Sequence, residues 1–149
     1  MSGNTNPPTN ASAADSDSSK RRVALIIEDN EDQGEIMSAT LRRLDLEPIV
    51  EARGQDAIAK YNELHPVLIM LDINLPDMSG WEVLDALKES NPDAPPRPAV
   101  IVLTAFGDQK NRLAGKIRGV DEYLVKPLLP DQILNIVRKV LVDRENDTP

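Results

Sequence analysis

Residues 65–80, HPVLIMLDINLPDMSG, contain the feature that decides the fold. The apolar run 67–71 leads directly into Asp72, and residues typical of turns follow at once. A short apolar run that is bounded by turn residues is typical of a strand buried on both faces of a sheet. The sequence therefore predicts a buried strand that carries a charged side chain at its carboxyl end.

Similar apolar runs recur along the chain. These strand-like runs alternate with segments whose apolar residues have helical spacing. Alternating strands and helices predict an α/β fold with a parallel sheet and helices on both faces. Pro48 lies inside the second strand-like run, which indicates a sheet edge. The expected strands are 23–27, 46–52, 67–71, 99–103 and 120–125, and the expected helices are about 30–44, 54–64, 79–90, 108–118 and 130–141.

Three local signals mark the beginnings of helices. Asn30 is a suitable N-cap for the first helix. Ser79 and Glu82 have the spacing of a capping box, in which each side chain bonds the other residue's backbone N–H. Pro130 suits the first turn of the last helix.

Length, composition and charge narrow the functional classes. The chain has 149 residues, 40% of them hydrophobic, which is the size of one domain with a real core. The net charge of −8 argues against direct nucleic-acid binding. There is no cysteine, no secretory signal and no apolar run long enough for membrane insertion, so we expect a cytoplasmic protein. Residues 1–21 are expected to form a disordered tail and residues 144–149 a frayed end.

Charged and polar side chains stand at the carboxyl ends of four expected strands. In an open parallel sheet, ligands bind in the crevice outside these ends. Each residue alone has an ordinary explanation, such as a helix-terminus charge, an Asx-turn or a surface lysine. Together they would place three acids in one crevice, where like charges repel, and a bound divalent cation would remove that repulsion. The residues are Glu28, Asp29, Asp72, Thr104 and Lys126.

The donor types of this crevice indicate a metal ion beside a phosphoryl group. An all-oxygen ligand set suits Mg²⁺, with Mn²⁺ as the alternative. The Thr104 hydroxyl and the Lys126 ammonium could both hold a phosphoryl group. The chain has no glycine-rich phosphate loop, and the first turn is acidic, so a bound nucleotide is not expected. The phosphoryl group is most simply covalent, on the carboxylate of Asp72.

With this set of residues, the chain resembles the receiver domain of two-component response regulators, the CheY-like family. The motifs that carry the resemblance are IIEDNE, LDINLPDMSG, VLTA and YLVKP, which occur in this order. The resemblance covers residues 22–143 and implies a doubly wound, flavodoxin-like sheet with strand order 2-1-3-4-5. That order makes the second strand an edge, in agreement with Pro48.

The resemblance also implies the metal and acceptor roles. Asp72 is expected to accept the phosphoryl group from a sensor histidine kinase or a histidine phosphotransfer protein. Asp29 is expected to bind Mg²⁺ directly, Glu28 through water and Asn74 through its backbone carbonyl, and Asp72 is expected to be a further ligand of the metal.

The switch residues follow from the same resemblance. Lys126 is expected to neutralise the phosphoryl oxygens, and Thr104 to reach toward them. Tyr123 is expected to turn inward behind Thr104, so that the face of the fourth helix, fifth strand and fifth helix reports the change to an output protein or a homodimer. Pro127 matches the family's cis-proline position.

Two residues at the mouth of the site should tune the lifetime of the phosphoryl group. Asn74 and Phe106 each lie two residues beyond a strand-end site residue. A bulky apolar side chain such as Phe106 could hinder the attacking water, so we expect slow loss of phosphate. A second role for Phe106, packing on the fourth helix, fits the sequence equally well.

Two other functions would use some of the same residues. A phosphatase of the haloacid dehalogenase type also uses a strand-end aspartate with Mg²⁺, but it needs D-x-D-x-T after the first strand, and the third strand here ends in D-I-N. A degenerate receiver that acts as a phosphorylation-independent scaffold would not need the complete set of acids, threonine and lysine. We expect a regulatory phosphoacceptor rather than an enzyme, with only self-phosphorylation from small donors and autodephosphorylation. No output domain follows residue 149, so a stand-alone receiver is expected.

Overall fold

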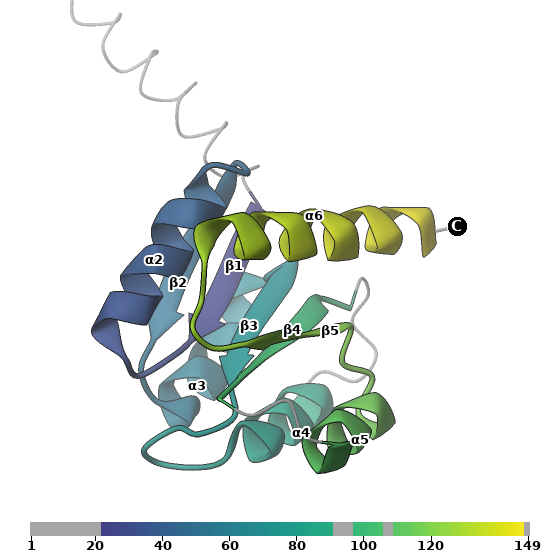
Figure 1. Ribbon diagram of the computed structural model, residues 1–149. Coiled ribbons are helices and arrows are strands. Elements are labelled where there is room, and N and C mark those ends of the chain that lie inside the picture. Colours follow the sequence, from purple (N-terminus) through teal and green to yellow (C-terminus); the bar gives the residue numbers. More distant parts are fainter. Residues whose placement is uncertain (1–21, 91–96, 106–108, 148–149) are drawn as a thin grey trace, which may run out of the picture.

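The computed structural model describes residues 22–90, 97–105 and 109–147. Within these residues, one sheet of five strands is covered by five helices (Figure 1). The strands are β1 (Arg22–Ile27), β2 (Leu46–Glu51), β3 (Leu68–Asp72), β4 (Ala99–Thr104) and β5 (Glu122–Val125). The helices are α2 (Glu31–Arg42), α3 (Gly54–Leu64), α4 (Gly80–Ser90), α5 (Gln109–Ile117) and α6 (Pro130–Asp147).

The sheet is parallel throughout and has the strand order β2-β1-β3-β4-β5. The expected doubly wound fold is therefore confirmed, and β2, which contains Pro48, lies at an edge. Proline has no N–H to donate to a neighbouring strand, and an edge strand needs donors on one side only. The expected N-cap is also present, since Asn30 Oδ1 accepts a hydrogen bond from Gln33 N at 2.9 Å.

The two faces of the sheet pack against different helices. On β1, Ala24 and Ile26 point into the core beneath α2 and α6, whereas Leu25 and Ile27 point into the core beneath α3 and α4. This alternation follows from the two-residue period of a strand, and it buries β1, β3 and β4 on both faces. Figure 1 shows α2 and α6 together on one side and α3, α4 and α5 on the other.

Two boundaries differ from those that the sequence indicated. β5 begins at Glu122 rather than at residue 120, because the chain is still completing the end of α5: Val120 N donates to Gly115 O, and Gly119 has a φ of +76°. α6 continues to Asp147, beyond the expected domain end at residue 143. A side-chain hydrogen bond of 2.7 Å from Arg144 to Asp121 Oδ2 holds that added turn against the start of β5.

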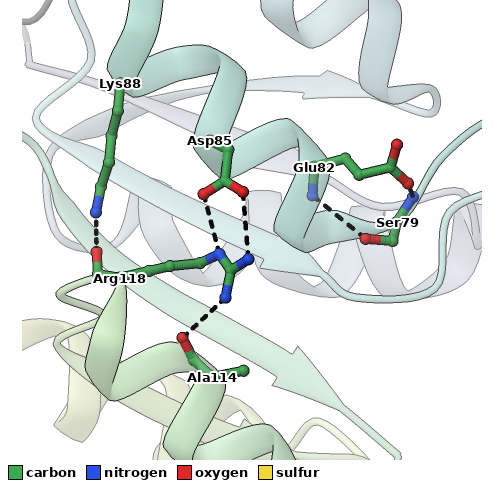
Figure 2. Close-up of polar contacts among 6 residues, drawn as sticks. All are labelled: Ser79, Glu82, Asp85, Lys88, Ala114 and Arg118. Carbon is green, nitrogen blue, oxygen red and sulfur yellow. Dashed lines mark hydrogen bonds and ion pairs between the residues drawn. The ribbon is translucent and has the colours of Figure 1, made fainter.

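Polar contacts join α4 to its neighbours (Figure 2). The capping box is present, with Ser79 N donating to Glu82 Oε1 at 3.1 Å and Glu82 N donating to Ser79 Oγ at 3.3 Å. Arg118, just beyond α5, makes two hydrogen bonds with the Asp85 carboxylate, at 3.0 and 3.2 Å. Lys88 donates to the Arg118 carbonyl, so α4 holds the end of α5 at two points.

Candidate functional site

Three carboxylates meet at the carboxyl ends of β1 and β3. Glu28 and Asp29 follow the last residue of β1, and Asp72 is the last residue of β3. One carboxylate oxygen of each residue lies within 4.8 Å of those of the other two. Glu28 and Asp72 are buried, with 2% and 4% exposure, while Asp29 is exposed to solvent. The expected acidic crevice therefore has a buried floor and an open rim.

Lys126 supplies the positive charge of the crevice. It follows the end of β5, and its Nζ lies 2.8 Å from Asp72 Oδ2 and 3.1 Å from Glu28 Oε1. Burial would lower the pKa of Lys126, but the hydrogen bond to Asp72 and the charges of Asp72 and Glu28 outweigh burial and raise it. The ammonium is therefore charged at neutral pH. Its backbone N–H donates to Thr104 O at 2.8 Å, which joins this residue to β4.

The Glu28 carboxyl binds its proton more tightly than an ordinary glutamate does. Burial, followed by the hydrogen bond to Asp72 and its negative charge, raises the pKa of the Glu28 carboxyl from 4.5 to about 7. Glu28 Oε2 accepts from Asn30 N at 3.1 Å. Glu28 Oε1 is buried and has no hydrogen-bond partner among the described residues, although the Lys126 ammonium lies beside it as an ion pair.

The loop after Asp72 folds back tightly on the strand end. Asn74 N donates to Asp72 Oδ1 at 2.9 Å, and Gly80 N donates to Ile73 O at 2.7 Å. A Cβ at Gly80 would lie 2.6 Å from Asp72 O and 2.8 Å from Ile73 Cα, so only glycine allows this approach. Asn74 is exposed at the mouth of the crevice. Its position fits the expected role of its carbonyl at the rim.

The residues expected to act as the switch lie on β4 and β5. Thr104 is the last residue of β4 and is buried, with 3% exposure, opposite Val125 in the strand register. The Tyr123 hydroxyl lies 2.9 Å from Asn111 O and 3.0 Å from Arg112 O, so in this structure it donates to the backbone of α5. Burial raises the pKa of the Tyr123 phenol.

Two further expectations concern residues next to this site. The Lys126–Pro127 peptide bond is cis, as the motif indicated. Phe106 lies outside the described residues, and its expected role stays a prediction.

The residues of this crevice fit a divalent cation. Mg²⁺ takes oxygen ligands and shares its shell among a few carboxylates, carbonyls and waters. Glu28, Asp29 and Asp72 offer clustered carboxylate oxygens, and within the described part of the chain one buried oxygen of Glu28 has an ion-pair contact with Lys126 but no hydrogen bond. The single ammonium of Lys126 leaves the cluster with a net negative charge, which a cation would balance.

Two contacts near the site were not evident from the sequence. Asp77 accepts two backbone hydrogen bonds from the first residues of α3, which lie 22 and 23 positions earlier in the chain. The Tyr123 ring lies against Gly115, where a Cβ would come within 1.5 Å of the Tyr123 hydroxyl. The sequence signals for these contacts are a polar turn residue, Asp77, and a glycine, Gly115. Neither signal indicates which residue will be contacted.

The comparison with known protein families agrees with the fold and the acidic crevice. The profile of the response regulator receiver domain matches residues 24–138. The chain belongs to this family. The receiver domain is a regulatory module of two-component signalling, and the alternative assignments to a phosphatase or a scaffold are not favoured.

Similar proteins include both full regulators and isolated domains. The chain is 33% identical over 119 residues to the probable transcriptional regulatory protein TcrX of Mycobacterium tuberculosis, covering 80% of this chain and 49% of TcrX. It is 33% identical over 129 residues to the regulatory protein LuxO of Vibrio parahaemolyticus, covering 83% of this chain and 28% of LuxO. The chain thus spans about half, or less, of the length of these curated relatives.

Solved structures support the same fold. The chemotaxis protein CheY4 of Vibrio cholerae superimposes with a TM-score of 0.73 at 26% identity, over 80% of this chain and 98% of CheY4. A CheY-like receiver domain protein of Methanospirillum hungatei has a TM-score of 0.75 at 25% identity, over 85% of this chain and 98% of that protein. No helix in the described part of this receiver domain is long and apolar enough to cross a membrane.

Proposed function

We propose that this receiver domain is a phosphorelay switch in which Asp72 accepts a phosphoryl group from a histidine kinase or a histidine phosphotransfer protein. The contact between Asp72 and Lys126 carries this proposal, because it pairs a buried strand-end carboxylate with an ammonium at 2.8 Å. In the transfer, an Asp72 carboxylate oxygen attacks phosphorus, the P–N bond of the phosphohistidine breaks, and its electron pair stays on the imidazole. The product is an acyl phosphate.

The residues of the crevice would assist this transfer in distinct ways. Lys126 would move from the Asp72 carboxylate to the incoming phosphoryl oxygens and neutralise their charge. Asp29, Asp72, Glu28 and the Asn74 carbonyl would hold Mg²⁺, with Mn²⁺ as a substitute. The metal, when bound, offsets the repulsion between the carboxylates and the phosphoryl group. Thr104 would donate its hydroxyl to a phosphoryl oxygen.

The face formed by α5, β5 and α6 would transmit the phosphorylation signal to other proteins. Apolar side chains exposed on these elements, among the described residues, include Leu113, Ile117 and Val125, with 59%, 74% and 40% exposure. Tyr123 lies under α5 and bonds its carbonyls, so an inward movement of Tyr123 would release part of that helix. We propose that this face contacts an output protein or a second copy of the chain, and that the signalling takes place in the cytoplasm.

The decisive experiment is intact-mass measurement after incubation with Mg²⁺ and acetyl phosphate. The wild type is expected to gain one phosphoryl mass, and Asp72→Asn is expected to gain none. Asp56→Asn, which removes an exposed carboxylate from α3, is the matched control and should be modified like the wild type. A wild type that binds Mg²⁺ but gains no mass would contradict the switch and favour a scaffold.

The lifetime of the phosphoryl group gives a second test. If Phe106 shields the acyl phosphate from water, replacing it with serine should speed the loss of the added mass. Unchanged decay would assign Phe106 to packing. Replacing Asn74, the other residue expected at the mouth, tests whether shielding is particular to Phe106.

A further inference from the structure

A carboxylate in the loop that carries the phosphoacceptor caps a different helix. α3 begins at Gly54, and its own N-cap residue, Arg53, makes no side-chain capping bond. The Asp77 carboxylate takes that place, since Oδ1 accepts from Gly54 N and Oδ2 from Gln55 N, both at 2.9 Å. These two bonds lower the pKa of Asp77, so it is ionised at neutral pH and suits the positive end of the helix.

An apolar contact reinforces this cap. A Cβ at Gly54 would lie 2.6 Å from Met78 Cγ and 2.6 Å from Val83 Cγ2, so the absence of a side chain lets Met78 lie against the start of α3. Asp77 and Met78 are consecutive residues of the loop. The tip of the loop is therefore held on α3 by one charged and one apolar contact.

The same loop forms one wall of the proposed metal site. It leaves the sheet at Asp72, and Asn74 both donates to Asp72 Oδ1 and offers the carbonyl expected to bind the metal. The base of the loop is closed by the bridge between Asn74 and Ser79. The two residues between Asn74 and the Asp77 cap leave little freedom for the carbonyl to reorient.

The opposite wall of the metal site is connected to α3 as well. α3 follows β2, and Glu28 N donates to Glu51 O at the end of that strand at 3.0 Å. The Asp77 cap therefore links the loop beyond β3 with the side of the sheet that carries Glu28 and Asp29. Both halves of the proposed ligand set are therefore connected through the segment that runs from Glu51 at the end of β2 to the first turn of α3.

We propose that Asp77 is a positioning residue for the divalent cation: it sets the Asn74 carbonyl and the Asp72 carboxylate relative to Asp29. This inference rests on the metal site of the proposed function. Residues that orient metal ligands through hydrogen bonds typically change metal affinity by about 10–100-fold when they are replaced. Because Asp77 acts through the loop, we expect a change near the lower end, about tenfold.

The test is direct titration with Mn²⁺, following the free ion by electron paramagnetic resonance, with folding checked by circular dichroism. Asp77→Ala should raise the dissociation constant about tenfold. Asp77→Asn keeps one carbonyl acceptor and should recover part of the affinity. Asp56→Ala is the matched control, because it removes the same charge from the exposed first turn of α3, and it should bind like the wild type.

The outcomes separate this inference from the proposed function. A folded Asp77→Ala protein whose dissociation constant stays within about twofold of the wild type would overturn the positioning role, as would an equal effect of Asp56→Ala. Phosphorylation of Asp77→Ala should be slow at low Mg²⁺ and approach the wild-type rate at saturating Mg²⁺. A wild type that binds Mn²⁺ but is not phosphorylated would contradict the switch alone, whereas failure to bind Mn²⁺ would overturn both.

Discussion

Lys126 Nζ lies 2.8 Å from Asp72 Oδ2, in a crevice where the Asp72 side chain is 5% exposed and the Lys126 side chain 20% exposed. The same ammonium lies 3.1 Å from the fully buried Glu28 side chain. One cation thus balances two buried carboxylates from neighbouring strands. A phosphoryl group or a metal ion that enters the crevice must therefore compete with these two ion pairs of Lys126 or replace them.

The first prediction concerns the loss of that cation. Lys126→Met should lower the free energy of unfolding by about 1–3 kcal/mol, because it leaves buried charged groups without a partner. Added Mg²⁺ should stabilise this variant more than the wild type, since the metal supplies the missing positive charge. Urea unfolding with and without Mg²⁺ measures both effects.

A matched control for Lys126 exists on the surface. Lys139 Nζ also contacts a carboxylate, Glu122 at 2.6 Å, but its side chain is 62% exposed. Lys139→Met should change stability less than Lys126→Met does and should not alter the effect of Mg²⁺. Equal losses in the two variants would contradict the special role of the buried pair.

The second prediction concerns the pH dependence of the metal-free protein. The pKa of Glu28 is about 7 in the folded state and 4.5 when unperturbed, so the folded state binds the proton more tightly. Between these two values unfolding releases a proton, and the free energy of unfolding falls as pH rises, by about 3 kcal/mol in total. Above pH 7 this contribution is constant.

Glu28→Gln tests that assignment. Glutamine does not titrate, so the variant in a chelating buffer should lose the part of the pH dependence that lies between about 4.5 and 7. Thermal unfolding at closely spaced pH values measures the difference. If wild type and variant have parallel curves, the titrating group in that range is another residue.

The third prediction concerns the contacts between α4 and the end of α5 (Figure 2). Asp85→Asn keeps one acceptor oxygen but loses the bidentate ion pair with Arg118. The free energy of unfolding should fall by about 0.5–1 kcal/mol, a small loss because both side chains are partly exposed. The Arg118 guanidinium also lies 5.4 Å from the centre of the Trp81 ring. Its displacement should shift Trp81 fluorescence.

Hydrogen exchange adds a structural readout for the same change. The amide groups at the end of α5 should exchange faster in Asp85→Asn, because Arg118 no longer holds that end against α4. Glu89→Gln removes a charge from an exposed position of the same helix and serves as the control. Unaltered Trp81 emission and exchange in Asp85→Asn would mean that Lys88 alone holds the helix end.

The fourth prediction concerns Gly115 and Tyr123. A Cβ at Gly115 would overlap the Tyr123 hydroxyl, so Gly115→Ala must displace the ring and break its hydrogen bonds to the α5 carbonyls. We expect destabilisation, although alanine by itself favours a helix over glycine by about 1 kcal/mol. In a Tyr123→Ala background the same change should become stabilising. A double-mutant cycle without coupling would contradict the steric argument.

Much of the fold could be predicted from the sequence for local physical reasons. Apolar runs ending in Asp29 and Asp72 identify buried strands, and alternating helices require parallel pairing, which brings the strand ends to one edge. Pro48, Asn30 and the Ser79–Glu82 box act within a few residues, so their effects are readable in the chain itself.

The contacts that only the tertiary structure decided join residues far apart in sequence. Asp77 reaches α3 across 23 positions and Arg118 reaches Asp85 across 33. Which side chains meet there depends on how helices cross and how tightly glycines allow them to approach, as at Gly115. The proton affinity of Glu28 likewise depends on burial beside Asp72, because desolvation is a property of the packed crevice and not of a glutamate in a chain.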